Sequence, residues 1–92
     1  METWQSAFVD VFRRKGFELA DPPVCLKDSL RMNIDSQIGR LVLRVDLEPS
    51  PVMKDQLFVK RGKSLRARRM SEGSMDPQRF ALQCVHRSDL HL

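Results

Sequence analysis

The side chains best suited to binding chemistry are concentrated in one ten-residue run, Lys60 to Arg69, which reads Lys-Arg-Gly-Lys-Ser-Leu-Arg-Ala-Arg-Arg. This run holds six cationic side chains and no anionic one, whereas the whole chain of 92 residues has a net charge of only +4. The other residues are therefore slightly acidic in sum. Such a concentration of one charge sign predicts an anionic partner rather than a generally basic protein.

The basic run has the chemistry of a phosphate-binding surface. Arginine offers a planar fork for bidentate bonding, and lysine offers a compact point charge. We therefore predict contacts with a nucleic-acid backbone through the cations of the run, on a hairpin or loop: Lys60, Arg61, Lys63, Arg66, Arg68 and Arg69. Two alternatives stay open, which are docking to an acidic protein surface and a solvated edge strand without a dedicated ligand. The chain has no tyrosine and a single tryptophan, so base stacking is not expected to dominate.

Other patterns that suggest chemistry are incomplete. Gly62-Lys63-Ser64 resembles the end of a phosphate-binding P-loop, but the glycine required five residues earlier is replaced by Leu57. Cys84 and His86 lie two residues apart but lack an identifiable orienting carboxylate or oxyanion hole. The sequence therefore predicts a protein that is not an enzyme and needs no cofactor.

A candidate regulatory site follows the basic run. Arg68-Arg69-Met70-Ser71 matches the Arg-Arg-x-Ser pattern of basophilic kinases. Phosphorylation of Ser71 would add about −1.5 to −2 charges beside the cations and would oppose the binding of an anion.

The composition of the chain limits the remaining classes of protein to which it could belong. The chain is 41% hydrophobic and 30% charged, which is typical of one small globular domain spanning residues 1–92. Its two cysteines, Cys25 and Cys84, are expected to be free thiols, and two histidines without a Cys-x-x-Cys spacing predict no metal site. No apolar run reaches the roughly 18 residues of a membrane span and no leader pattern is present, so we expect an intracellular, cytoplasmic protein, or a nuclear one in a eukaryotic host.

Helical spacing of apolar residues predicts an amphipathic helix from Thr3 to about Lys15. Its buried stripe would comprise Trp4, Ala7, Phe8, Val11 and Phe12. Thr3 is the candidate N-cap and Gly16 the candidate C-cap, because glycine adopts the left-handed conformation without strain.

Alternating apolar residues predict the strands that follow. The first lies between Val24 and Asp35 with a break at Asp28, and the second runs from Leu41 to Glu48 after a turn that ends at Gly39. A third, Gln56 to Lys60, forms a hairpin with the basic run through an Arg61-Gly62 turn, or else the run forms a flexible loop or a short helical turn.

The end of the chain completes the predicted architecture. We expect a flexible loop over about residues 71–78, a last strand from Arg79 to Arg87 and a short tail over 88–92. The predicted fold is α+β, with the N-terminal helix packed on a four-stranded, mainly antiparallel sheet. This order is similar in layout to the opening of double-stranded RNA-binding domains and to small secretion chaperones, and no function is carried over from either.

The leading functional hypothesis is thus a small non-enzymatic regulator that contacts nucleic-acid backbone. The second is a protein adaptor, inhibitor or chaperone-like module that docks an acidic partner, with a homodimer as one form. The outward-facing Val42 and the unplaced Met53 and Met75 motivate this second hypothesis.

Overall fold

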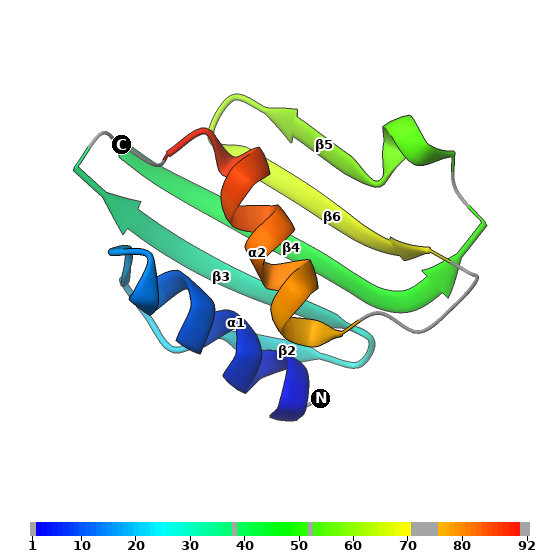
Figure 1. Cartoon of the computed structure of the whole chain (residues 1–92), viewed down its shortest axis with the longest axis horizontal. Coiled ribbons are helices and arrows are strands. Elements are labelled where there is room, and N and C mark those ends of the chain that lie inside the picture. The colour runs from blue at the N-terminus through cyan, green and yellow to red at the C-terminus, as the bar shows by residue number, and fades with distance from the viewer. Residues whose placement is uncertain (1, 38, 52, 71–75, 91–92) are drawn as a thin grey trace.

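The computed structural model of the chain describes residues 2–37, 39–51, 53–70 and 76–90 (Figure 1). The described residues form two α-helices, six strands and one short 3-10 helix. In chain order they are α1 (Glu2–Arg14), β1 (Glu18–Leu19), β2 (Val24–Leu26), β3 (Ser29–Ser36), β4 (Gly39–Ser50), η1 (Lys54–Gln56), β5 (Phe58–Arg61), β6 (Ser64–Met70) and α2 (Pro77–Ser88).

The strands form one mixed sheet in the order β1-β3-β4-β6-β5, and β2 also pairs with β3. The β4–β6 pair is parallel, and the other pairs are antiparallel. The predicted α+β class with an N-terminal helix is confirmed. The predicted strand number of four is wrong, because the described sheet has six strands, and a second helix, α2, was not predicted. The sheet is mixed, although four of its five strand pairs are antiparallel.

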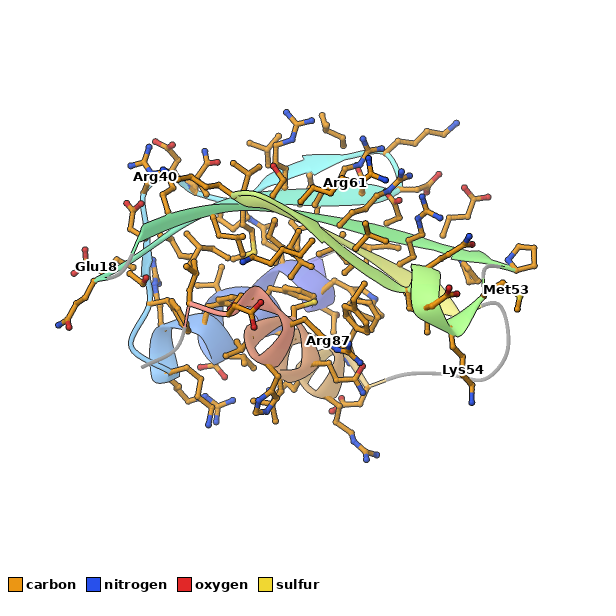
Figure 2. All side chains as sticks on the ribbon, turned by 90° about the horizontal axis from the view of Figure 1, so that it is seen from above. Glu18, Arg40, Met53, Lys54, Arg61 and Arg87 are labelled. Carbon is orange, nitrogen blue, oxygen red and sulfur yellow. The ribbon has the colours of Figure 1, made fainter. Side chains whose placement is uncertain are left out.

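Both helices cover the same face of the sheet. Figure 2 shows the sheet from its edge, with the helices below it and Arg61 above it. Three phenylalanines, Phe8, Phe12 and Phe80, are almost completely buried between the layers, where they meet alternate side chains of the central strands. No described element covers the opposite face, so the outward-pointing side chains of the same strands meet solvent.

The first helix forms as its apolar spacing predicts. Ala7, Phe8, Val11 and Phe12 are buried, and Trp4 packs against the same core. The C-cap prediction for Gly16 is confirmed, because this residue has a φ of +90°. Phe17 N–H donates to the carbonyl of Phe12 at 3.1 Å, which closes a Schellman motif. Thr3, the predicted N-cap, instead lies inside α1.

The predicted last strand, Arg79 to Arg87, is wrong because this segment belongs to α2. Phe80 and Cys84 fit both the alternation of a strand and the i, i+4 spacing of a helix, but the buried set also includes Ala81, Val85 and Ser88. Asp76 caps the helix, since its carboxylate accepts the Arg79 N–H at 3.3 Å, and Pro77 occupies the first turn.

The break predicted at Asp28 is a tight turn. Lys27, with a φ of +27°, and Asp28 reverse the chain so that β2 folds back on β3. The next predicted hairpin is confirmed, because β3 and β4 pair antiparallel from Ser29 opposite Asp46 to Ser36 opposite Gly39. The strand predicted from Leu41 to Glu48 is longer in the structure, since β4 runs from Gly39 to Ser50.

The basic run spans the end of β5, a turn and most of β6, so it forms a hairpin rather than a flexible loop or a helical turn. The predicted hairpin with β5 is confirmed, but its register is shifted: Arg61 pairs with Ser64, and Gly62 and Lys63 form the turn. With the predicted Arg61-Gly62 turn, Lys60 would face Lys63, whereas in the structure Lys60 pairs with Leu65. It also places Phe58 opposite Ala67 on the face that the helices cover.

Two further predictions concern the C-terminal part of the chain. Within the predicted loop 71–78, residues 71–75 lie outside the described ranges, and so does the candidate phosphorylation site Ser71. Pro77 and Gln78 begin α2 rather than extending the loop. Within the predicted tail 88–92, Ser88 is buried at the end of α2 and its hydroxyl donates to the carbonyl of Val85 at 2.6 Å. Neither described helix has the length and apolar character needed to cross a membrane.

The helical assignment of the C-terminal segment can be tested at its cap. Replacing Asp76 with alanine removes the acceptor for a free N–H group, and we expect the free energy of unfolding to fall by about 0.5–2 kcal/mol. Urea denaturation followed by far-UV circular dichroism measures this change. Gln78→Ala, an exposed substitution in the same turn, is the control and should change stability much less. An equal loss in the two variants would contradict capping by Asp76.

Candidate functional site: an arginine cluster on the open face of the sheet

On the uncovered face of the sheet, five arginines from four strands line one hollow. β3 contributes Arg31 and β4 contributes Arg44, while Arg61 comes from β5 and Arg66 and Arg68 come from β6. With Asp46 of β4, which contacts three of them, these residues are called the arginine face. Five positive charges and one negative charge give the arginine face a formal excess of +4.

Strand register brings the arginines into adjacent rows. Arg31 is the cross-strand partner of Arg44, and Arg44 is in turn the partner of Arg66. Val59 of β5 ends this row next to Arg66. Adjacent strands lie about 4.8 Å apart, and like charges in facing positions repel each other. The row is therefore a costly arrangement that nearby anions would relieve.

Asp46 supplies one such anion. Its Oδ1 accepts from Arg44 Nε at 3.2 Å, and its Oδ2 accepts from Arg66 Nε at 2.9 Å. Arg66 Nη2 also lies 2.8 Å from Oδ2, and Arg68 Nε lies 4.0 Å from it. The Asp46 side chain is only 20% exposed. One carboxylate thus orients three guanidinium groups but neutralises one charge among them.

Arg68 retains a donor that the described residues leave unused. Its Nε is buried, and no hydrogen-bond partner for this atom is found in the described part of the chain. A buried donor without a partner costs about 1–3 kcal/mol. An oxyanion or a water bound beside Asp46 would satisfy it.

The arginines surround a hollow with mixed chemistry. Its volume is about 900 Å³, and apolar contacts are offered by Val42 and Val59. Polar side chains are supplied by Asn33, Gln56 and Ser64. Arg31 and Arg61 also line the hollow, and neither forms an ion pair with a described residue. These two cations are therefore available to an external anion.

The structure divides five of the six cations of the basic run between two faces and places the sixth in a turn. Arg61, Arg66 and Arg68 lie on the arginine face, and Lys63 lies in the exposed turn next to it. Lys60 points to the helix side, where its Nζ is 3.7 Å from Asp89. The strand period of two explains this division, because neighbouring residues project to opposite faces.

Arg69 also lies on the helix side, where its contacts are internal. Its guanidinium stands over the Trp4 ring at 5.0 Å from the centroid, and Nη1 donates to the carbonyl of Leu47 at 3.0 Å. Arg69 therefore ties the end of β6 to α1 and β4. Such contacts have a structural purpose that does not require a ligand.

Sequence reasoning missed Arg31 and Arg44 as members of the site. Each of these arginines lies between two buried residues of its strand, so the alternation of apolar and polar residues places it on the open face. Asp46 is placed on the same face by the same alternation. Their strands are far from the basic run in sequence, however. Only the β4–β6 pairing shows that the two sets of arginines share one surface.

The other patterns singled out in the sequence form no reactive arrangement in the described residues. Cys84 is buried in α2, and burial raises the pKa of its thiol well above the ordinary value. His86 is exposed on the same helix, so the two side chains do not share a face. Gly62-Lys63-Ser64 spans a turn between two strands rather than the start of a helix. No group of three or more potential metal ligands occurs within the described ranges.

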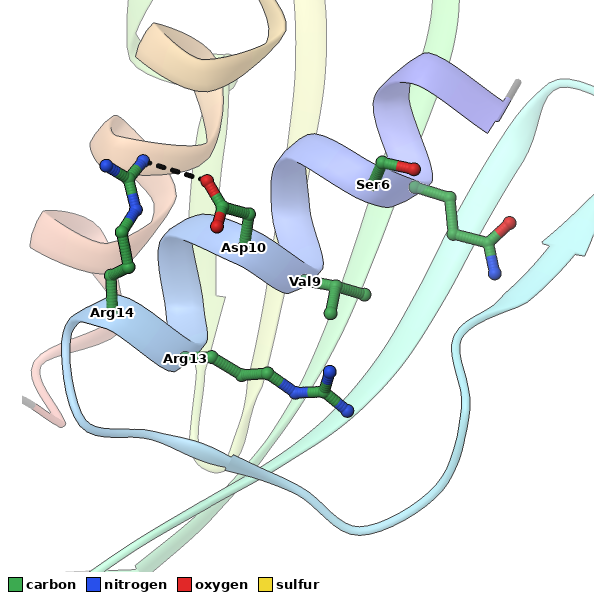
Figure 3. A pocket seen from close by; sticks show the side chains of 6 residues that line it. Ser6, Val9, Asp10, Arg13 and Arg14 are labelled. Carbon is green, nitrogen blue, oxygen red and sulfur yellow. Dashed lines mark ion pairs between the residues drawn. The ribbon is translucent and has the colours of Figure 1, made fainter.

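A second hollow lies along the outer side of α1 (Figure 3). Its volume is about 530 Å³, and Val9, Arg13 and the ion pair between Asp10 and Arg14 line it. Asp10 Oδ2 and Arg14 Nη2 are 3.1 Å apart, so these two opposite charges balance. This hollow lacks the concentrated charge of the arginine face, which remains the stronger candidate.

The role of Asp46 in holding the arginines can be tested by Asp46→Asn. We expect stability to fall by about 1–2 kcal/mol at low ionic strength, because the three arginines lose their counter-charge. The loss should shrink as salt screens the repulsion between them. Urea denaturation at low and high salt measures both effects.

Asp35→Asn is the matched control because Asp35 also lies on the open face but pairs, among the described residues, with one arginine, Arg40, whose Nε lies 2.6 Å from Asp35 Oδ1. The hydrogen bond from Arg40 holds the pKa of Asp35 below its usual value. This pair therefore adds stability above the unfolded pKa of about 4 and loses it as the pH falls through the lower folded value. A salt-independent loss in Asp46→Asn would contradict the electrostatic account.

Comparison with known proteins provides no functional assignment. The arginine face is consequently interpreted from its geometry and charge alone. No protein-family model, curated protein or solved structure matches this chain.

Proposed function

We propose that this chain is a small, non-enzymatic regulatory binding protein that holds the backbone of a nucleic acid against the arginine face. The observation that carries the proposal is the clustering of five arginines around one hollow with a single associated carboxylate. The proposal moves the predicted site from an independent basic hairpin to the open face of the sheet. A nucleic-acid partner would place the protein in the cytoplasm, or in the nucleus of a eukaryotic host.

The type and spacing of the cations support phosphate as the ligand group. All five cations that line the hollow are arginines, whose planar forks bind phosphate oxygens in pairs. They lie on adjacent strands about 4.8 Å apart, so one phosphate can contact two of them. Arg31 and Arg61, without ion pairs in the described residues, would make the first contacts.

Backbone contact should dominate over base stacking. The ring of Trp4 packs against Phe8 and Phe80 on the helix side of the sheet. Phe58 likewise contacts Phe80 there, and no described aromatic residue lines the hollow. Affinity would therefore come mainly from counterion release and would depend only weakly on the base sequence of the nucleic acid.

Removing arginines from the face should weaken binding to a labelled oligonucleotide. For Arg31→Ala combined with Arg44→Ala, we expect a loss of affinity of at least about tenfold at low salt and a shallower salt dependence, because fewer phosphates are neutralised. Fluorescence anisotropy over a series of salt concentrations measures both quantities. Arg13→Ala combined with Arg79→Ala removes the same charge from exposed positions on the helices. Equal losses in the two double variants would point to a non-specific effect of net charge.

Asp46 should compete with the ligand for the arginines that it holds. Asp46→Asn is therefore expected to raise affinity for the oligonucleotide by several-fold, because Arg44, Arg66 and Arg68 become available to phosphate. Asp35→Asn changes net charge by the same amount at a position paired only with Arg40. Anisotropy titrations should show a smaller gain for the Asp35 variant, and the reverse order would argue against binding at the arginine face.

An acidic protein surface is the second candidate. Val42 and Val59 lie half-buried among the arginines, and the combination of arginine with apolar contacts is typical of the centres of protein interfaces. Under this alternative the protein would act as an adaptor or inhibitor. A labelled polyglutamate peptide that binds more tightly than an oligonucleotide of equal charge would favour it over the first proposal.

A further inference from the structure

We infer that the nucleic acid held by the arginine face is single-stranded. This inference rests on the proposed function and adds the class of ligand. Three features favour a flexible single strand over a duplex: the β5–β6 hairpin is embedded in the sheet, the cationic cluster is compact, and the hollow has polar groups able to reach base edges.

The hairpin that carries the basic run does not project from the protein. β6 pairs with β4 on one side and with β5 on the other, so it is an interior strand. The carbonyl of Lys63 in the turn accepts the N–H of Val42 at 2.8 Å, which ties the turn to the sheet. A two-stranded ribbon must stand free to enter the major groove, which is about 12 Å wide and 8.5 Å deep. This hairpin is therefore unsuited to reading a duplex groove.

The cationic cluster is too compact to follow a rigid duplex for long. The row formed by Arg31, Arg44 and Arg66 crosses three adjacent strands, a span of about 10 Å at 4.8 Å per step. Arg61 and Arg68 lie on the neighbouring rows, each about 7 Å along the strands. A flexible strand can curve so that several phosphates lie on this cluster. A stiff duplex would present few of its phosphates to it.

The hollow also offers groups that an unpaired base could use. Asn33, Gln56 and Ser64 carry amide or hydroxyl groups at its lining, beside the half-buried Val42 and Val59. These groups can bond the edges of bases that are not already paired. Guanidinium planes of arginine also stack on exposed bases, which partly replaces the missing aromatic contacts. In a duplex the base faces are stacked on each other and are not available.

The test compares two labelled ligands by fluorescence anisotropy with the full chain. One is an oligothymidine of about twelve nucleotides, which lies within the site sizes of roughly 4–16 nucleotides seen in single-strand binders. The other is a blunt DNA duplex with the same total number of phosphates. We expect the single strand to bind at least about tenfold more tightly, with a log–log salt slope of about −0.7 per phosphate engaged.

Four single-arginine variants are then titrated with both the oligothymidine and the duplex. Arg44→Ala and Arg66→Ala should weaken binding of the single strand, whereas Arg13→Ala and Arg79→Ala should leave it nearly unchanged. Far-UV circular dichroism confirms that each variant is folded before its affinity is compared.

The possible results separate the inference from the proposed function. Equal or tighter binding of the duplex, still weakened by Arg44→Ala and Arg66→Ala, overturns the single-strand inference and leaves nucleic-acid binding intact. Failure of both ligands to bind, or binding that does not respond to these two substitutions, overturns both. A strong preference for the single strand that depends on Arg44 and Arg66 supports both.

Discussion

The position of β6 between β4 and β5 is the constraint on which the rest of the structure depends. Parallel pairing with β4 buries Leu65 and Ala67 beneath the helices, where they join the core. Because successive residues of a strand project to opposite faces, the side chains next to Leu65 and Ala67 must lie on the open face. Arg66 and Arg68 must point outward, beside Arg44 and Asp46. The same packing that stabilises the core therefore assembles the arginine face.

The electrostatics of the face follow from this arrangement. Burial is favourable on the inner side, but it forces positive side chains of neighbouring strands together on the outer side. Asp46 relieves part of the repulsion through contacts with three arginines. Because one carboxylate serves several cations, the face keeps an excess of positive charge. Asp46 thus has two opposite effects: its carboxylate stabilises the folded chain, and it competes with an external anion for the same arginines.

The sequence predicts a helix, cap or hairpin correctly where the local residue pattern is compatible with only one type of secondary structure. The apolar stripe of α1, its Gly16 cap and the β3–β4 hairpin all follow from spacing within a short segment. The C-terminal segment is ambiguous in sequence because Phe80 and Cys84 satisfy the periodicities of both a strand and a helix, whereas Asp76 and Pro77 carry a separate helix-capping signal. The capping signal favours the helix that the structure shows.

The candidate site was predictable only in part for a different reason. The charges of the basic run are evident in the sequence, but which of them face outward depends on parity, and which others join them depends on strand order. Lys60 and Arg69 turn to the helix side, and Arg31 and Arg44 join from distant strands. Strand order in a mixed sheet is set by packing over the whole domain, so no local pattern encodes it.

The position of β6 also has a kinetic consequence. The β5–β6 hairpin joins neighbouring segments, whereas the β4–β6 register joins residues as far apart as Val42 and Ser64. Local contacts close small loops at low entropic cost, and distant pairings must wait for larger loops to close. The hairpin should accordingly form early and add to β4 as a unit. Until that step is complete, the chain has an open strand edge on β4, and the charge of Arg44 on that strand would oppose its pairing with another chain.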